Sequence, residues 1–62
     1  SYDPSRVSCA EGRDIVRENG YSRVSTVECV GTTFTYTGER SGRTYRITVN
    51  ARTGDIVSRR RV

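Results

Sequence analysis

Two cysteines, Cys9 and Cys29, constrain this chain more than any other feature of its sequence. The chain has 62 residues, of which only 32% are hydrophobic. A domain of this size buries roughly 60% of its extended surface, so the free energy gained from the core nearly cancels the entropy lost on ordering. An even number of cysteines in so short a chain predicts a disulfide and an oxidising compartment. Closing the loop between them would stabilise the fold by roughly 3.3 kcal/mol.

The composition removes most catalytic chemistry. The sequence contains no histidine, and its 11 basic residues are all arginine. Histidine general bases and metal ligands, lysine Schiff bases and the Ser-His-Asp and Cys-His arrangements are therefore missing. The spacing of the cysteines is unlike a C-x-x-C redox or metal motif, although two free buried thiols remain an alternative to the bridge. We expect a protein that is not an enzyme and that has no cofactor and no metal.

A single helix is predicted near the N-terminus. Ser8 and Glu11 form an S-x-x-E capping box, which indicates that a helix begins at about Cys9. Asn19-Gly20 is a typical C-terminal stop, so the helix should end at about Asn19. Its buried side is narrow, and Tyr21 is placed to fold back on it. The residues expected on that side are Cys9, Gly12, Ile15 and Val16.

After Gly20 the sequence changes to β-branched and aromatic residues in short runs separated by glycine, which predicts strands. The expected strands cover residues 24–30, 32–37, 43–50 and 55–62. Alternation with period two indicates one buried face, although it does not decide which face of the last strand is buried. The residues expected on the buried face are Val27, Phe34, Tyr36, Tyr45, Ile47 and Val49. The predicted fold is α+β: one N-terminal helix packed on a three- to four-stranded antiparallel sheet, with a single disulfide joining helix and sheet.

The second half of the chain carries a recognisable pattern. After the helix come Gly20-Tyr21 and Val24, and the later segment reads Gly42-x-x-Tyr45-x-Ile47-x-Val49-x-Ala51-x-Thr53-Gly54-x-Ile56-Val57. This pattern resembles the PepSY domain, the peptidase propeptide and YpeB family, and in particular its small secreted bacterial type. The resemblance covers about residues 10–59, and Asn50 stands where the family usually has Asp.

The resemblance implies a non-catalytic module outside the cytoplasm, of a kind suspected of binding or restraining peptidases. We therefore expect a secreted or periplasmic protein whose signal peptide has been removed. Residues 1–7 lack periodicity and are expected to form a flexible leader, followed by one domain over residues 8–62. No apolar run is long enough to span a bilayer. The protein should be a monomer or a weak dimer paired through strand edges.

Two surfaces are candidates for binding. The open face of the predicted sheet and its edges could accept a protein or peptide by β-augmentation. The arginine-rich last strand, with Arg43, Arg46 and Arg52 near it, could instead bind a polyanion or an anionic surface. The candidate residues are Thr33, Thr35 and Thr37 on the open face, together with Arg46, Arg59, Arg60 and Arg61. A solvated sheet face and a charged chain end are the simpler interpretations of both groups. Nucleic-acid binding is not expected, because the aromatic residues are predicted to be buried.

Overall fold

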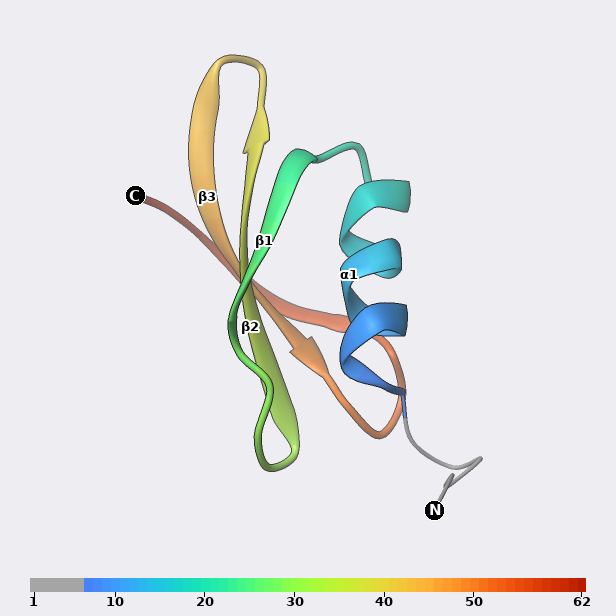
Figure 1. Cartoon of the computed structure of the whole chain (residues 1–62). Helices are drawn as coiled ribbons and strands as arrows, with labels where there is room; N and C mark the ends of the chain where they lie inside the picture. Colours follow the sequence, from blue (N-terminus) through green and yellow to red (C-terminus); the bar gives the residue numbers. More distant parts are fainter. Residues whose placement is uncertain (1–6) are drawn as a thin grey trace.

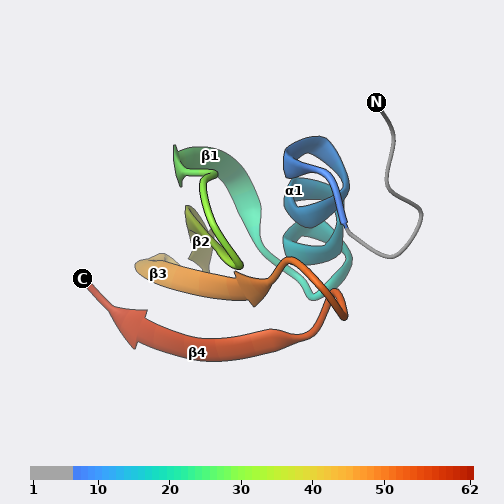
Figure 2. The same cartoon turned by 90° about the horizontal axis from the view of Figure 1, so that it is seen from below.

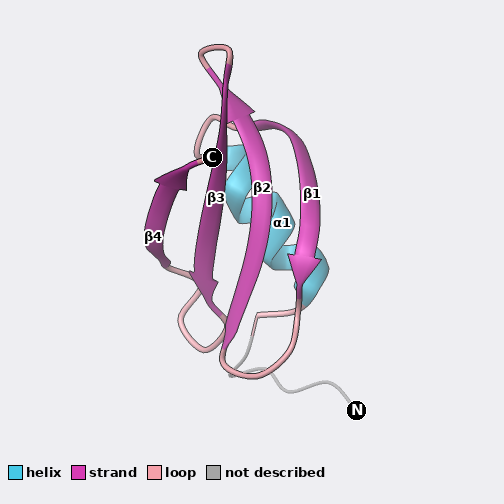
Figure 3. Cartoon of the chain, turned by 90° about the vertical axis from the view of Figure 1, so that its left-hand side faces the viewer, coloured by secondary structure: helices cyan, strands magenta, loops and turns pink. Residues whose placement is uncertain are grey.

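The computed structural model describes residues 7–62 and has one helix followed by four antiparallel strands. The elements are α1 (Cys9–Glu18), β1 (Ser22–Glu28), β2 (Thr33–Arg40), β3 (Arg43–Asn50) and β4 (Ile56–Arg61). The strands lie in the sheet in chain order, β1-β2-β3-β4, so each pairs with the next (Figure 3). This confirms the predicted α+β fold. Most of the expected leader, residues 1–6, lies outside the described residues.

The helix begins and ends close to the predicted residues. At its start the Ser8 hydroxyl accepts from the Glu11 amide at 3.1 Å, and the Glu11 carboxylate accepts from the Ser8 amide at 3.0 Å. Both hydrogen bonds of the predicted capping box are therefore present. At the other end Asn19 is the C-cap, one residue beyond the last helical residue. Gly20 follows with a φ of 97°, in the left-handed region that glycine adopts without a steric cost.

The helix packs on one face of the sheet, mainly against β1 and β2 (Figures 1 and 2). Figure 2 shows that β4 lies on the opposite flank of the sheet from the helix. The core forms between the two layers and is small. Its buried residues are Val16, Tyr21, Phe34, Tyr36, Ile47, Val49 and Ala51. The predicted core residue Tyr45 is only half-buried and packs against the edge of this cluster.

The first strand differs from its prediction. It covers Ser22–Glu28 rather than residues 24–30, and its pairing with β2 is irregular at two places. At the second irregularity Thr26 pairs with Tyr36 and Glu28 pairs with Thr35, so two steps along β1 match one step along β2. Such a bulge shifts the alternation of faces. The expectation that Val27 is buried was therefore wrong, and its side chain is 50% exposed.

The second strand continues three residues further than predicted. A two-residue turn, Ser41-Gly42, joins it to β3, and both residues have positive φ, 54° and 75°. Arg40 pairs directly with Arg43 across this turn. The positive φ values at both central positions are those of a type I′ turn, whose twist suits a hairpin. The strands therefore stay paired up to the turn, and Arg40 belongs to β2.

The predicted disulfide joins the helix to the sheet. Cys9 in the first turn of α1 is bonded to Cys29, just after β1, with 5.8 Å between their Cα atoms. Beside the bridge the Tyr36 hydroxyl donates to the Cys9 carbonyl at 2.7 Å. Burial raises the pKa of Tyr36, and the positive charge of Arg13 opposes this effect. The hydroxyl therefore stays protonated and keeps donating to the helix.

Candidate functional site

The edge strand β4 is the least covered element of the sheet. Only Ile56 is half-buried, and the other residues of β4 are exposed. β4 pairs with β3 alone, so the backbone groups along its other edge have no strand beside them among residues 7–62. The opposite edge strand, β1, has its two pairing irregularities and a positive φ of 52° at Arg23. The pairing of β4 with β3 has one irregularity of its own, at Val57, but residues 58–61 pair regularly. A further extended strand would therefore fit better beside residues 58–61 of β4 than beside β1.

The register divides the arginines of β4 between the two faces of the sheet. Arg59 pairs with the buried Ile47, which places it on the face that carries the helix. Arg61 pairs with Tyr45 and lies on the same face. Arg60 pairs with Arg46 on the opposite face of the sheet, which we call the outer face. The register therefore places Arg60 on the other face of the sheet from Arg59 and Arg61, although Arg59 and Arg60 both border one hollow beside Arg46.

The outer face carries the candidate threonines. Thr35 pairs with Thr48 and Thr37 pairs with Arg46, so this threonine surface adjoins the Arg46–Arg60 pair. Thr33 is exposed, whereas Thr35 and Thr37 are half-buried by their neighbours. A shallow hollow of about 300 Å³ lies beside them. It is lined by Arg46, Thr48, Ser58, Arg59 and Arg60. The outer face is therefore polar and basic, and has no aromatic side chain among the residues that line this hollow.

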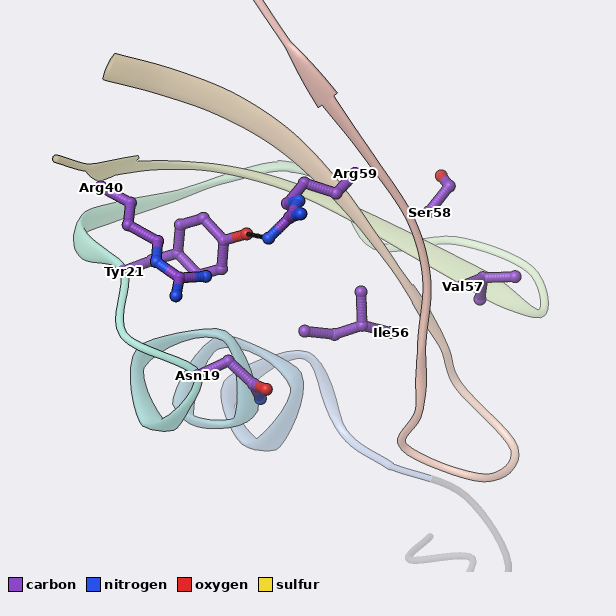
Figure 4. A pocket seen from close by; sticks show the side chains of 7 residues that line it. All are labelled: Asn19, Tyr21, Arg40, Ile56, Val57, Ser58 and Arg59. Carbon is purple, nitrogen blue, oxygen red and sulfur yellow. Dashed lines mark hydrogen bonds between the residues drawn. The ribbon is translucent and has the colours of Figure 1, made fainter. Parts of the chain in front are cut away.

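A larger groove lies on the other side of the sheet, between the end of the helix and β4 (Figure 4). Its volume is about 330 Å³. We call it the β4 groove. It is lined by Asn19, Tyr21, Arg40, Ile56, Val57, Ser58 and Arg59. Three separate parts of the chain meet here: the end of α1, the end of β2 and the edge strand.

Two glycines position Tyr21 in this groove. Gly20 reverses the chain after the helix, and its φ of 97° is a value that glycine adopts readily. Gly38 of β2 leaves the space into which Tyr21 packs, because a Cβ atom at Gly38 would lie 3.0 Å from the Tyr21 Cβ. The Tyr21 side chain is in consequence only 5% exposed. Its hydroxyl nevertheless reaches the groove, where it can accept a hydrogen bond.

Tyr21 and Tyr45 hold two arginines in place. The tyrosine rings are in edge-to-face contact, with their centroids 5.9 Å apart. The Arg40 guanidinium carbon lies 5.7 Å from the centre of the Tyr21 ring, and the Arg59 guanidinium carbon lies 5.7 Å from that of Tyr45. Arg59 also donates through Nη1 to the Tyr21 hydroxyl at 3.3 Å, as Figure 4 shows. We call these four residues the Arg–Tyr cluster. Its cation–π contacts hold each guanidinium group near the face of an aromatic ring.

The arginines of this region have no acidic partners. β3 and β4 carry Arg43, Arg46, Arg59, Arg60 and Arg61 and no acidic residue. Within residues 7–62 the one ion pair joins Arg17 to Asp14 on the exposed side of the helix, at 3.5 Å. The hydrogen bond to Tyr21 raises the pKa of Arg59, so its charge is fixed. β3 and β4 are therefore a basic region whose arginines form no salt bridge within residues 7–62.

Sequence reasoning found Arg59 but missed Arg40 and Tyr21 as candidate site residues. The predicted strands 32–37 and 43–50 leave Arg40 in the connection between them, and Tyr21 was expected only to fold back on the helix. Phe34, Tyr36 and Gly38 are the buried positions of β2, so continuing the period of two by one step would have placed Arg40 on their face. Arg52 lies in the loop between β3 and β4 and does not line the groove.

Comparisons with known proteins add no assignment to this site. Protein-family models, curated protein sequences and solved structures gave no match to this chain. The resemblance to the PepSY domain therefore stays a hypothesis that rests on the sequence pattern. Within the described part of the chain, no helix is long and apolar enough to cross a membrane. No cluster of three or more His, Cys, Asp or Glu residues that could hold a metal ion occurs there either.

Proposed function

We propose that this domain is a non-catalytic interaction module that binds an extended, acidic segment of a protein partner along β4. The observation that carries the proposal is an edge strand that is both exposed and arginine-rich, with no acidic residue on it or on its neighbour β3. In β-augmentation the backbone of the edge strand supplies affinity, and the side chains on either side of it supply specificity. The partner segment would become the fifth strand of the sheet.

The charge of β4 decides between possible occupants of this edge. In a dimer paired through β4, the run Arg59-Arg60-Arg61 of one copy would lie against arginines of the other. Like charges placed directly opposite each other on neighbouring strands are destabilising. A strand with acidic side chains gains from the same arrangement. The proposal therefore names an acidic partner segment and not a second copy of the chain.

The disulfide and the PepSY resemblance supply the biological setting of the proposal. A bridge between Cys9 and Cys29 is typical of an oxidising compartment, which fits a secreted or periplasmic protein. If the resemblance reflects common descent, the partner is a peptidase, and β4 would restrain it by holding an extended segment of its chain. The domain itself contributes no catalytic group to this interaction.

Polyanion binding is the second candidate, and one observation favours it. Arg46 and Arg60 lie opposite each other on the outer face, beside a polar hollow. A polyanion could bind this pair without forming any backbone hydrogen bond. The division of the β4 arginines between two faces counts against it, because a polymer lying on one face would contact only part of the run.

A synthetic peptide can test the proposed function. The probe is a fluorescein-labelled peptide of roughly eight residues, within the usual length of a strand, in which glutamate and threonine alternate. Its binding to the oxidised domain is followed by fluorescence anisotropy and mapped by backbone amide NMR shifts. We expect saturable binding, with the largest shifts along β4 and the adjoining residues of β3.

The matched control is the same peptide with every backbone amide N-methylated, so that neither edge keeps an N–H donor. It has the same charge but cannot donate hydrogen bonds to a neighbouring strand, so it should bind about tenfold more weakly. Equal binding of both peptides would mean that charge alone drives association, and would replace the proposal with polyanion binding. No binding of either peptide would refute both candidates.

A further inference from the structure

We propose that the β4 groove is a binding pocket for a carboxylate group, which Arg40 and Arg59 hold between them. The pocket rests on the proposed function only for the source of the carboxylate, which would be an acidic side chain or the C-terminal group of the docked segment. The geometry of the pocket stands independently of that source. Arg40 and Arg59 both line one groove, and Figure 4 shows the Arg40 guanidinium beside the Tyr21 ring and the Arg59 guanidinium at its hydroxyl.

The Arg–Tyr cluster leaves most of the arginine donors free for a ligand. Each guanidinium group has five N–H donors. Among the described residues Arg59 donates one hydrogen bond, to the Tyr21 hydroxyl. The guanidinium group of Arg40 lies over the Tyr21 ring. The aromatic contacts therefore fix where the two groups lie while using few of their donors. A carboxylate between them would accept charge-assisted hydrogen bonds in the paired geometry that arginine favours.

The end of the helix is arranged so that it repels an anion less strongly. Unsatisfied carbonyl groups give a helix C-terminus a partial negative charge, which would oppose carboxylate binding nearby. Here the Ile15 carbonyl accepts from the Asn19 side-chain amide at 2.7 Å, and the Arg17 carbonyl accepts from the Gly20 amide at 3.0 Å. The Val16 carbonyl accepts from the Asn19 backbone amide at 3.1 Å. These carbonyl groups of the last helical turn are therefore capped, while the two arginines that line the groove have no acidic partner among residues 7–62.

The position of the pocket matches the alternation of a docked strand. Every second side chain of a strand added to β4 points to the side of the sheet that carries the helix. Ile56 and Arg59 pair with the buried Val49 and Ile47, so they lie on that side of β4 and line the groove, and such a side chain would lie at its mouth. The remaining side chains would point to the outer face, toward Arg60 and Arg46. An acidic residue on the helix side is thus the one that the pocket would select.

Glutarate tests the pocket without any peptide. The oxidised domain is titrated with this dicarboxylate at low ionic strength, and the Nε–Hε NMR signals of the arginines are followed. We expect the signals of Arg40 and Arg59 to move together along one saturation curve. Arg40→Gln and Arg59→Gln should each weaken glutarate binding about tenfold, because each removes charge-assisted hydrogen bonds.

Arg60→Gln is the matched control. It removes the same charge from the neighbouring residue of the same strand, but on the outer face. We expect it to change glutarate affinity by less than roughly twofold, the effect of screened charge alone. If Arg60→Gln weakened binding as much as Arg59→Gln, the pocket would be refuted in favour of general attraction to the basic flank. Circular dichroism spectra matching those of the parent would establish that each variant is folded.

Peptide variants identify the source of the carboxylate and separate the two proposals. Replacing the glutamates of the probe peptide by glutamine tests the side-chain source, and amidating its C-terminus tests the terminal source. The change that removes the group bound by the pocket should also make the affinity for the peptide insensitive to Arg40→Gln. Peptide binding that is insensitive to Arg40→Gln would refute the pocket and leave the proposed function intact. Glutarate binding without peptide binding would refute the proposed function and leave the pocket intact.

Discussion

At the scale of single residues, the contact between Gly12 and Tyr36 sets how closely the helix approaches the sheet. A Cβ atom at Gly12 would lie against the Tyr36 hydroxyl oxygen and 3.0 Å from the ring carbon that carries it. The same hydroxyl donates to the Cys9 carbonyl at 2.7 Å, and Tyr36 is fully buried. The glycine thus leaves the space in which the only buried hydroxyl-to-helix hydrogen bond of the described core can form.

Gly12→Ala should destabilise the domain, although alanine is the better helix former. Overpacking against Tyr36 should cost roughly 1–3 kcal/mol, which exceeds the gain in helix propensity of about 1 kcal/mol. The measurement is the urea midpoint by circular dichroism. In a Tyr36→Phe background, which lacks the hydroxyl, the cost of the alanine should fall. A midpoint that rises in the parent chain would contradict this account of the contact.

At the scale of elements, the β2–β3 hairpin depends on a turn whose central residues both have positive φ. Ser41 and Gly42 adopt φ values of 54° and 75°. Glycine does so without strain, whereas serine is not among the residues most favoured there. The turn keeps Arg40 paired with Arg43 and so determines where the Arg40 side chain enters the β4 groove. The geometry of the turn therefore affects the position of Arg40 in the candidate site.

Two turn variants should have opposite effects on stability. Gly42→Ala should cost roughly 1–2 kcal/mol, the penalty of a Cβ atom in the left-handed region. Ser41→Asn should raise the stability, because Asn-Gly is the preferred pair of this turn type. Thermal unfolding of the two oxidised variants beside the parent measures both. If the two substitutions moved the melting temperature in the same direction, the assigned turn geometry would be incorrect.

The elements also show how far the sequence could predict the structure. The helix start and β3 were predicted to the residue, because a capping box and an uninterrupted alternation are local signals. Val27 was misplaced because a bulge arises from pairing between strands, which a period of two along one strand does not contain. The β4 groove could not be predicted from the sequence for a similar reason. Arg40 and Tyr21 come from distant parts of the chain, and only the packing of the helix end on the sheet brings them together.

At the scale of the whole molecule, the disulfide joins the two layers covalently beside the hydrogen bond from Tyr36 to Cys9. Within residues 7–62 the core has seven buried hydrophobic residues, and the helix packs mainly on β1 and β2. The bridge from Cys9 to Cys29 spans 20 positions of the chain. It restricts the unfolded chain and holds the start of the helix against the sheet. In a domain this small, that restriction is comparable to the whole free energy of unfolding.

Replacing both cysteines by serine should lower the free energy of unfolding by about 2–5 kcal/mol. We expect the double variant to be largely unfolded at 37 °C, the usual outcome when a small secreted domain loses its bridge. Amide hydrogen exchange and circular dichroism of the variant, beside the oxidised parent, provide the measurement. A well-dispersed NMR spectrum with unchanged exchange protection would show that the core suffices without the bridge.

The placement of charge across the sheet also makes the molecule an electric dipole. The helix on the β1 flank carries three acidic residues, Glu11, Asp14 and Glu18, and two arginines, Arg13 and Arg17. The charged residues of β3 and β4 are all arginines. The field of such a molecule turns an approaching acidic partner toward one flank before the two surfaces touch. Association through β4 would then be faster than random collision allows, since fewer encounters begin in the wrong orientation. The separation of charge thus governs how quickly a partner arrives, apart from how tightly it is held.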